Sequence, residues 1–273
     1  MKGRGYMFRE CINKETGIMS LCNYDESDNR KVIAVDVDGV LYDLTMALNK
    51  TSPLLNMLPL CDDILYDYSY SVYPEWVRKV IFECFNTDTA GVWDRPDCFY
   101  KNAFDFLKSI VSVIDTKKYK VVIHTMVPNV EGAGFRYRYL NSALNTKGMG
   151  SDIFVCVDVA EKQVMPNCVA IIDDYLGNIV KSKAPIKLVP SHSYNVVKPF
   201  TSYNIEDVID VAVTRAVEDG VATYWVGSSY YSLFNAFVTL LQEYEKGTEL
   251  DYTAIEYIPV EENKNFYVPR VKP

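Results

Sequence analysis

Two aspartates separated by one residue are the part of the sequence best suited to chemistry. The stretch reads Asp36-Val37-Asp38-Gly39-Val40 and directly follows a short apolar run. On an extended backbone, residues i and i+2 point to the same side, so both carboxylates can face one pocket. Crowded carboxylates repel each other unless a hard cation such as Mg²⁺ neutralises them. The pair therefore indicates an Mg²⁺ site, although a calcium-like loop or a plain turn gives the same short pattern.

Further polar residues follow later apolar runs. Thr125 ends one run, and its hydroxyl could hold a phosphate oxygen. Lys162 follows the next run and could offset the charge of a bound anion. Asp173 and Asp174 follow a fourth run, where they either add a second carboxylate pair or cap the helix expected from Tyr175. Each feature alone is weak evidence for a functional site. Together they place polar groups after successive predicted strands.

Short runs rich in β-branched residues predict the strands that position these groups. The runs are residues 31–37, 119–124, 152–157, 169–173 and 186–189. Helical patterns at 134–144 and 175–183 lie between them, and this alternation is typical of right-handed βαβ crossovers. The sequence therefore predicts an α/β fold with a Rossmann-like, doubly wound parallel sheet, in which ligands bind at the carboxyl ends of the strands.

The connection from the first strand to the second is far longer than the dozen or so residues that a crossover helix needs. Residues 44–114 hold helical patterns at 74–85 and 99–114, and they are rich in aromatic residues. These aromatics are Tyr66, Tyr68, Tyr70, Tyr73, Trp76, Trp93, Phe99 and Tyr100. We expect a small helical cap that closes over a ligand, with the packed core of the cap as the other role for any single ring.

The chain divides into four parts on this pattern. They are a leader segment at 1–30, a core at 31–43 and 115–200, the cap at 44–114, and a C-terminal helical extension and tail at 201–273. The leader is polar and unpatterned. The extension holds helical patterns at 205–219 and 229–244, which we expect to pack on the core or to form a homo-oligomer contact.

Composition limits the partners. Against 28 Lys and Arg there are 36 Asp and Glu, a formal net charge of −8, and an acidic surface repels a polynucleotide backbone. Any nucleotide ligand is therefore expected to be small. The apolar runs are too short to cross a membrane, and the N-terminus does not resemble a secretory signal, so we expect a cytoplasmic protein.

The cysteines and histidines limit the chemistry. The seven cysteines form no CxxC pair and have no histidine at zinc spacing, so we expect reduced, mostly structural thiols. His124 and His192 are the only histidines, which excludes chemistry that needs several imidazoles. We therefore expect carboxylates to be the catalytic groups.

In order, the aspartate pair at 36 and 38, Thr125, Lys162 and the Asp173-Asp174 pair resemble the motifs of the haloacid dehalogenase-like phosphohydrolase superfamily. The resemblance spans residues 31–195 and is strongest to the 5′(3′)-deoxyribonucleotidases. It includes Leu41 after the first motif, 11 residues from Lys162 to Asp173, the stretch DDYLGNI at 173–179, and Tyr194-Asn195 after the last strand. That family also carries a helical cap after the first motif.

The resemblance implies roles for the residues that match. Asp36 would be the nucleophile that forms an aspartyl-phosphate, and Asp38 would act as general acid and then as general base. Thr125 and Lys162 would bind the transferring phosphoryl group.

The same resemblance implies an Mg²⁺ ion as cofactor. Asp36, the backbone carbonyl of Asp38 and Asp173 would hold it, with Asp174 as a supporting or water-mediated ligand.

Two features depart from the family pattern. After Thr125, residues 126–129 read MVPN, where relatives more often have Ser or Thr followed by Pro, so the phosphate-side loop is expected to differ. Arg136 and Arg138 could reach a second phosphate, but we expect both to be solvated charges on a helix.

The sequence thus predicts an Mg²⁺-dependent phosphatase of a small phosphate ester, with a nucleoside or deoxynucleoside monophosphate as the expected substrate. One alternative is a phosphatase of a sugar phosphate or another metabolite. A second is a non-catalytic binding protein on the same scaffold, with the acidic tail as its partner surface. A phosphatase of polynucleotide ends is disfavoured by the acidic charge balance.

Overall fold

The computed structural model describes most of the chain. The described residues are 8–14, 16–25, 27–57, 73–86, 91–190, 192, 224–227, 229–250, 255–260 and 263–271. Several predicted features lie outside them. These features are the helix at 205–219, the pair Tyr194-Asn195, and Tyr66, Tyr68 and Tyr70.

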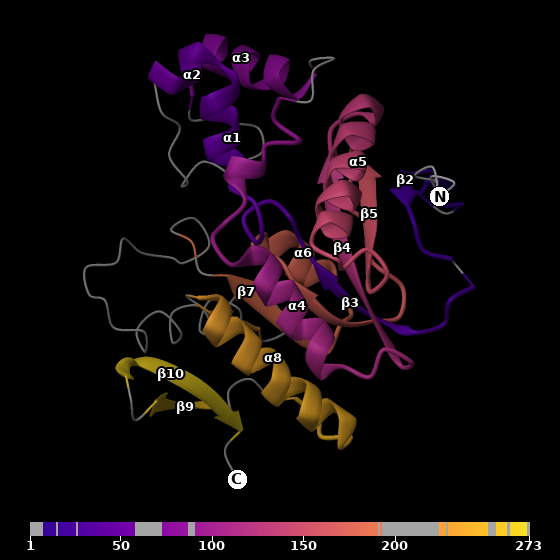
Figure 1. The fold of residues 1–273 in the computed structure, drawn as a ribbon, viewed down its shortest axis with the longest axis vertical. Coiled ribbons are helices and arrows are strands. Elements are labelled where there is room, and N and C mark those ends of the chain that lie inside the picture. The colour runs from indigo at the N-terminus through magenta and orange to yellow at the C-terminus, as the bar shows by residue number, and fades with distance from the viewer. Residues whose placement is uncertain are drawn as a thin grey trace.

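An eight-stranded sheet in the order β1-β2-β5-β4-β3-β6-β7-β8 forms the centre of the fold (Figure 1). Strands β3 to β8 run parallel to one another, whereas β2 pairs antiparallel with β5. They are β3 (Lys31–Val35), β4 (Tyr119–Val127), β5 (Ile153–Val159), β6 (Cys168–Ile172), β7 (Ile186–Pro190) and β8 (Trp225–Gly227). The predicted α/β fold with a doubly wound parallel sheet is confirmed.

Strand β3 lies in the middle of the parallel part of the sheet, and both of its faces are covered. Ile33 and Val35 belong to the main hydrophobic core, whereas Val32 and Ala34 belong to a second cluster on the opposite face. A strand buried on both sides reads as a continuous apolar run rather than an alternating one. The order of strands reverses at β3, and ligands bind at such a reversal in open α/β sheets.

Helices connect the parallel strands, as the sequence predicts. They include α4 (Ala103–Val113), α5 (Val130–Thr146) and α6 (Leu176–Lys181). The first turn of α5 is fixed by Asn129, whose side-chain oxygen accepts a hydrogen bond from the amide of Gly132 at 2.7 Å. This cap places α5 directly after β4, beside the end of the strand that carries Thr125.

The insert between β3 and β4 begins with α1 (Leu44–Thr51), α2 (Pro53–Met57) and α3 (Glu75–Phe85), which stand away from the sheet at one end of the molecule (Figure 1). A short 3₁₀ turn at Pro96–Cys98 leads from them to α4. Helix α4 lies beside the sheet rather than with the first three helices. Within the predicted cap at 44–114, the part that stands off the sheet therefore ends before α4.

The N-terminal segment differs from the unpatterned leader that the sequence indicates. Strands β1 (Arg9–Ile12) and β2 (Met19–Cys22) form an antiparallel hairpin, and β2 pairs with β5. Strands of four residues are too short to show a clear alternation of polar and apolar side chains. The exposed edge of β5 supplies the backbone partners that make this segment a strand.

The C-terminal part packs on the core through α8 (Tyr230–Glu245), as the sequence predicts for this helix. Its inner face, with Phe237 and Leu240, is buried in the main core. The ring of Tyr230 stacks on Phe106 of α4 at 4.8 Å between centroids. Strands β9 (Ile255–Val260) and β10 (Asn263–Val271) form a separate hairpin beside α8 (Figure 1). No helix in the described ranges is both long enough and apolar enough to cross a membrane.

We predict that Phe237→Ala lowers the free energy of unfolding by about 3–5 kcal/mol, because it opens a cavity at a side chain that is 0% exposed. Denaturant unfolding measures the loss. Tyr231→Ala on the same helix is the control, since that ring is 51% exposed and its loss should cost much less. Equal effects of the two substitutions would contradict the placement of α8 in the core.

Candidate active site

The carboxyl ends of β3 and β6 bring the two aspartate motifs together. The amide of Asp36 donates to the carbonyl of Ile172 at 2.8 Å, so the strands stay paired up to the point where each carboxylate begins. Gly39 then turns the chain with a φ of +73°, in the left-handed region that favours glycine. This turn brings the chain back beside Asp38, and the amide of Gly39 donates to the carbonyl of Tyr42 at 2.9 Å.

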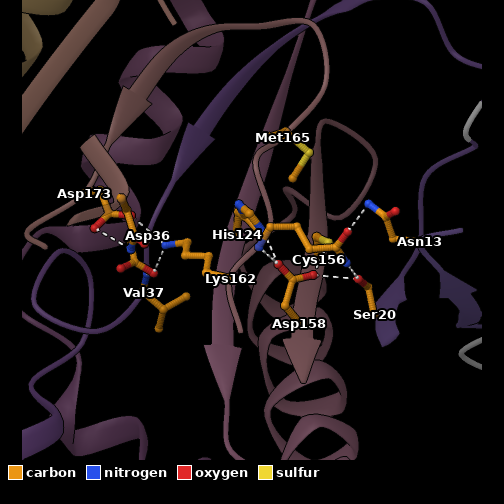
Figure 2. Close-up of polar contacts among 12 residues, drawn as sticks. Asn13, Ser20, Asp36, Val37, His124, Cys156, Asp158, Lys162, Met165 and Asp173 are labelled. Carbon is orange, nitrogen blue, oxygen red and sulfur yellow. Dashed lines mark hydrogen bonds and ion pairs between the residues drawn. The ribbon is translucent and has the colours of Figure 1, made fainter. Parts of the chain in front are cut away.

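A buried lysine joins the two motifs (Figure 2). The Lys162 amine lies 2.8 Å from Oδ1 of Asp36 and 2.7 Å from Oδ2 of Asp173. All three side chains are at least nine-tenths buried. Asp174 is buried beside them, and its carboxylate lies within 4.8 Å of those of Asp36 and Asp173. The sequence prediction that these residues meet at one sheet edge is therefore matched by the geometry.

Burial dominates the electrostatics of this cluster. It raises the pKa of Asp36 well above its usual range, and the nearby Asp173 and Asp174 raise it further, while Lys162 acts in the opposite direction. Burial alone would lower the pKa of Lys162, but the pairing with Asp173 and Asp36 outweighs it and raises that pKa. The lysine is therefore a fixed positive charge among carboxylates that repel one another.

The carboxylates fit a hard divalent cation. The oxygens of Asp36, Asp173 and Asp174 converge, and carboxylate oxygens are the protein ligands that Mg²⁺ takes. A single lysine does not balance three carboxylates, so a divalent ion would relieve the remaining repulsion.

Asp173 does not cap α6, whose N-cap residue is Tyr175 and has no side-chain capping bond, but it is held by the residues that begin this helix. Its Oδ1 accepts from the amide of Tyr175 at 2.9 Å, directly before α6. The side-chain amide of Asn178 donates to both carboxylate oxygens, at 3.2 and 3.1 Å. These bonds orient the carboxylate toward Lys162, so Asp173 belongs to the site rather than to a helix cap.

Asp38 has partners different from those of Asp36. Oγ1 of Thr125 donates to its Oδ2 at 3.3 Å, and Nη2 of Arg136 donates to its Oδ1 at 2.6 Å. Burial raises the pKa of Asp38, and Arg136 and Lys162 partly offset that rise. A carboxyl with a raised pKa can hold a proton closer to neutral pH, as a general acid requires.

Arg136 is the site residue that the sequence interpretation missed. It was expected to be solvated, but its side chain is fully buried, with the guanidinium carbon 4.4 Å from the ring centre of Tyr42 and 5.0 Å from that of Trp93. Helical spacing carries the signal, because Arg136 shares a face of α5 with Ala133 and Leu140, both buried. Arg138 is exposed, as expected.

The site opens into a cavity of about 340 Å³. Its polar floor is formed by Asp36, Asp38, Thr125 and Lys162. Its walls include Leu44, Phe82, Phe85 and Trp93 from the insert, Met126 and Pro128 from the loop after Thr125, and Tyr175 and Asn178 near α6. The cavity thus combines a charged end with an aromatic and aliphatic wall.

One predicted cap aromatic lies in this wall. Trp93 lines the cavity and stacks on Phe85 at 5.3 Å between ring centres. Phe82 and Phe85 of α3 were not singled out from the sequence, although they share a helix face at a spacing of three residues. Among the other predicted rings, Phe99 packs against the main core and Trp76 is exposed, so these two do not line the cavity.

A second network holds the segment that carries Lys162 (Figure 2). The amide of Gln163 donates to Oδ2 of Asp158 at 2.7 Å, and Nε2 of His124 lies 2.7 Å from the same oxygen. Oγ of Ser20, on β2, donates to Oδ1 of Asp158 at 2.6 Å. The N-terminal hairpin and the buried imidazole therefore help to fix the residue next to Lys162.

Comparison with known proteins finds only limited similarity. No protein-family model matches the sequence, and no curated protein sequence matches it. A predicted phosphatase from Clostridium acetobutylicum aligns with a TM-score of 0.41 and 12% identity, over 77% of this chain and 98% of that one. A haloacid dehalogenase-like family hydrolase from Streptococcus pneumoniae aligns with a TM-score of 0.37 and 13% identity, over 76% and 98%. Similarity of this extent does not identify a family, so function has to be argued from the residues of this chain.

We predict that Arg136→Met lowers the free energy of unfolding by about 3–5 kcal/mol at pH 7, because it leaves a largely buried carboxylate without its cation. Losing the guanidinium also raises the pKa of Asp38, since that charge lowers it in the parent protein. Arg138→Met, the same change at an exposed position of α5, should alter stability by less than about 0.5 kcal/mol. Denaturant unfolding of both variants measures the difference, and similar losses would argue against the buried pair.

Proposed function

We propose that this chain is an Mg²⁺-dependent phosphomonoesterase of the haloacid dehalogenase-like superfamily, acting on a small phosphate ester. The observation that supports this most strongly is the convergence of Asp36, Asp38, Thr125 and Lys162 on the floor of one cavity. These are the residues of the motif sequence, and the fold delivers them from three different strand ends. A binding protein without catalytic activity would not need a second carboxyl, Asp38, that has its own hydrogen-bond donors.

Asp36 is the proposed nucleophile. Its Oδ1 accepts from the amide of Val37 at 2.7 Å and contacts Lys162, so we assign the attack on phosphorus to Oδ2. The resulting aspartyl-phosphate divides a difficult hydrolysis into two displacements. Lys162 and Thr125 would compensate the negative charge on the oxygens of the transferring phosphoryl group.

Asp38 is the proposed acid and base. Protonated at the start, it would give its proton to the leaving oxygen and then accept one from the water that attacks the aspartyl-phosphate. Burial favours the protonated form, and Arg136 keeps the ionised form accessible for the second step. Arg136 also helps to fix the orientation of the carboxyl, since its Nη2 donates to Oδ1 of Asp38.

Mg²⁺ is the proposed cofactor, held by Asp36, the backbone carbonyl of Asp38 and Asp173, with Asp174 in support. When bound, the ion would supply positive charge that stabilises the phosphate oxygens and the ionised nucleophile. Because burial raises the pKa of Asp36, ionisation of this residue and binding of the cation should promote each other.

A nucleoside or deoxynucleoside monophosphate is the proposed substrate. Phe82, Phe85 and Trp93 line the same cavity as the phosphate-binding floor. A nucleobase can stack on such rings, with a gain of about 1–3 kcal/mol for each base–aromatic contact. A sugar phosphate, the alternative substrate, would leave the rings without a planar partner.

We expect phosphate release from nucleoside monophosphates with Mg²⁺, and loss of release with EDTA or in Asp36→Asn. The loss should be at least about 10³-fold, because the substituted amide cannot form the aspartyl-phosphate. Phosphate release from deoxynucleoside and ribonucleoside 5′- and 3′-monophosphates and from sugar phosphates is the measurement. Asp152→Asn, at an exposed position, is the matched control. A folded, Mg²⁺-binding protein that hydrolyses none of these esters would favour the binding-protein alternative.

We expect Phe82→Ala to raise KM for a nucleoside monophosphate about tenfold, with kcat little changed, because stacking binds the ground and transition states alike. KM for a sugar phosphate should barely move. Trp76→Ala is the control, since that ring lies on the same helix, is 49% exposed and does not line the cavity. Equal effects of Phe82→Ala on both substrate classes would contradict base stacking at this wall.

A further inference from the structure

The first strands carry thiols on one face of the sheet. Pairing places Cys11 of β1 opposite Ser20 of β2, and Cys22 of β2 opposite Cys156 of β5. Directly paired residues point to the same face, and so do residues two apart on one strand. Cys11, Cys22 and Cys156 therefore share a face, where they line a second cavity of about 300 Å³, separate from the floor formed by Asp36 and Lys162.

Two of these thiols lie in contact across the hairpin. Sγ of Cys11 is 3.1 Å from Sγ of Cys22, and the residues are diagonal neighbours in the antiparallel pair. A disulfide bond is about 2.05 Å long, so the sulfurs need to approach by only about 1 Å. Cys11 is partly exposed and Cys22 is buried, which gives the pair one sulfur that solvent reagents can reach.

We propose that Cys11 and Cys22 are a dithiol–disulfide modification site, at which a reversible disulfide ties β1 to β2. The site does not depend on the proposed phosphatase activity. Strand β1 is at the edge of the sheet and pairs with β2 within the described residues. A covalent link would hold this edge strand in register next to Ser20.

The reaction balances with a small-molecule disulfide as the oxidant. The Cys11 thiolate attacks one sulfur of that disulfide, which forms a mixed disulfide and releases the other half as a thiolate. The Cys22 thiolate then attacks Sγ of Cys11, so the Cys11–Cys22 bond forms and the second half leaves. Two protein thiols lose two electrons and two protons, and the small disulfide is reduced to two thiols.

The neighbouring groups favour this pair over Cys156. Sγ of Cys156 donates to Oδ1 of Asp158 at 3.7 Å and accepts from the hydroxyl of Tyr24 at 3.8 Å, so this thiol is engaged by other partners. Cys156, His124 and Asp158 also have ligand atoms within 4.8 Å of one another, as a soft metal site would. However, Nε2 of His124 already lies 2.7 Å from Oδ2 of Asp158, and a metal bound between these two atoms would have to replace that contact.

Treating the full chain with excess glutathione disulfide tests the proposal. After the remaining thiols are alkylated, trypsin should release residues 10–14 joined to residues 15–30, because it cuts after Arg9, Lys14 and Arg30. The joined peptides should weigh about 2 Da less than the sum of the two reduced peptides and should separate on reduction. The oxidised protein should also melt at a higher temperature than the reduced protein.

Two variants test which cysteines form the disulfide. Cys156→Ser should still yield the joined peptides, whereas Cys11→Ser should abolish them and remove the difference in melting temperature. A glutathione adduct that persists on Cys11, or a link from Cys22 to the tryptic peptide at 148–162, would overturn the proposal. Protection of the thiols by bound Zn²⁺, reversed by a chelator, would overturn it in favour of a metal site.

Discussion

The buried amine of Lys162 is the interaction on which the rest of the site depends. It contacts Asp36 at the end of β3 and Asp173 at the end of β6, and so joins the two motifs. Its charge opposes the rise in the pKa of Asp36 that burial and the neighbouring carboxylates cause. Much of the surrounding structure serves to keep it in place. The amide of Gln163 is fixed by Asp158, which in turn is held by β4 and by the N-terminal hairpin.

The two aspartates of the first motif have different neighbours. Asp36 faces a lysine and further carboxylates, an environment that a divalent cation would complete. Asp38 faces a threonine hydroxyl and a buried arginine, and so has its own local charge balance. Burial raises the pKa of both carboxyls, and each is paired with a different cation, Lys162 for Asp36 and Arg136 for Asp38. In the proposed mechanism, binding of Mg²⁺ would favour the ionised form of Asp36.

The sequence was sufficient where local pattern decides the structure. Continuous apolar runs predicted β3 to β7, and the polar residues that follow those strands meet because parallel strands end at one edge. Arg136 was misjudged because charge was weighed without its position on the buried face of α5. The hairpin of β1 and β2 was not predicted from the sequence because it pairs with the edge of β5, which is far away along the chain. The aromatic wall needs Phe82 and Phe85 of α3 to line the same cavity as residues at the strand ends, which spacing along the chain does not reveal.

The proposed mechanism requires that Asp36 becomes phosphorylated during turnover. The most direct measurement is to quench the protein during hydrolysis of a nucleoside monophosphate with Mg²⁺, reduce with borohydride, and sequence the tryptic peptide at 32–50 by mass spectrometry. Reduction converts an aspartyl-phosphate to homoserine. The account predicts homoserine at position 36 and at no other aspartate of that peptide. Turnover with an unmodified Asp36, or modification at Asp38 instead, would contradict it.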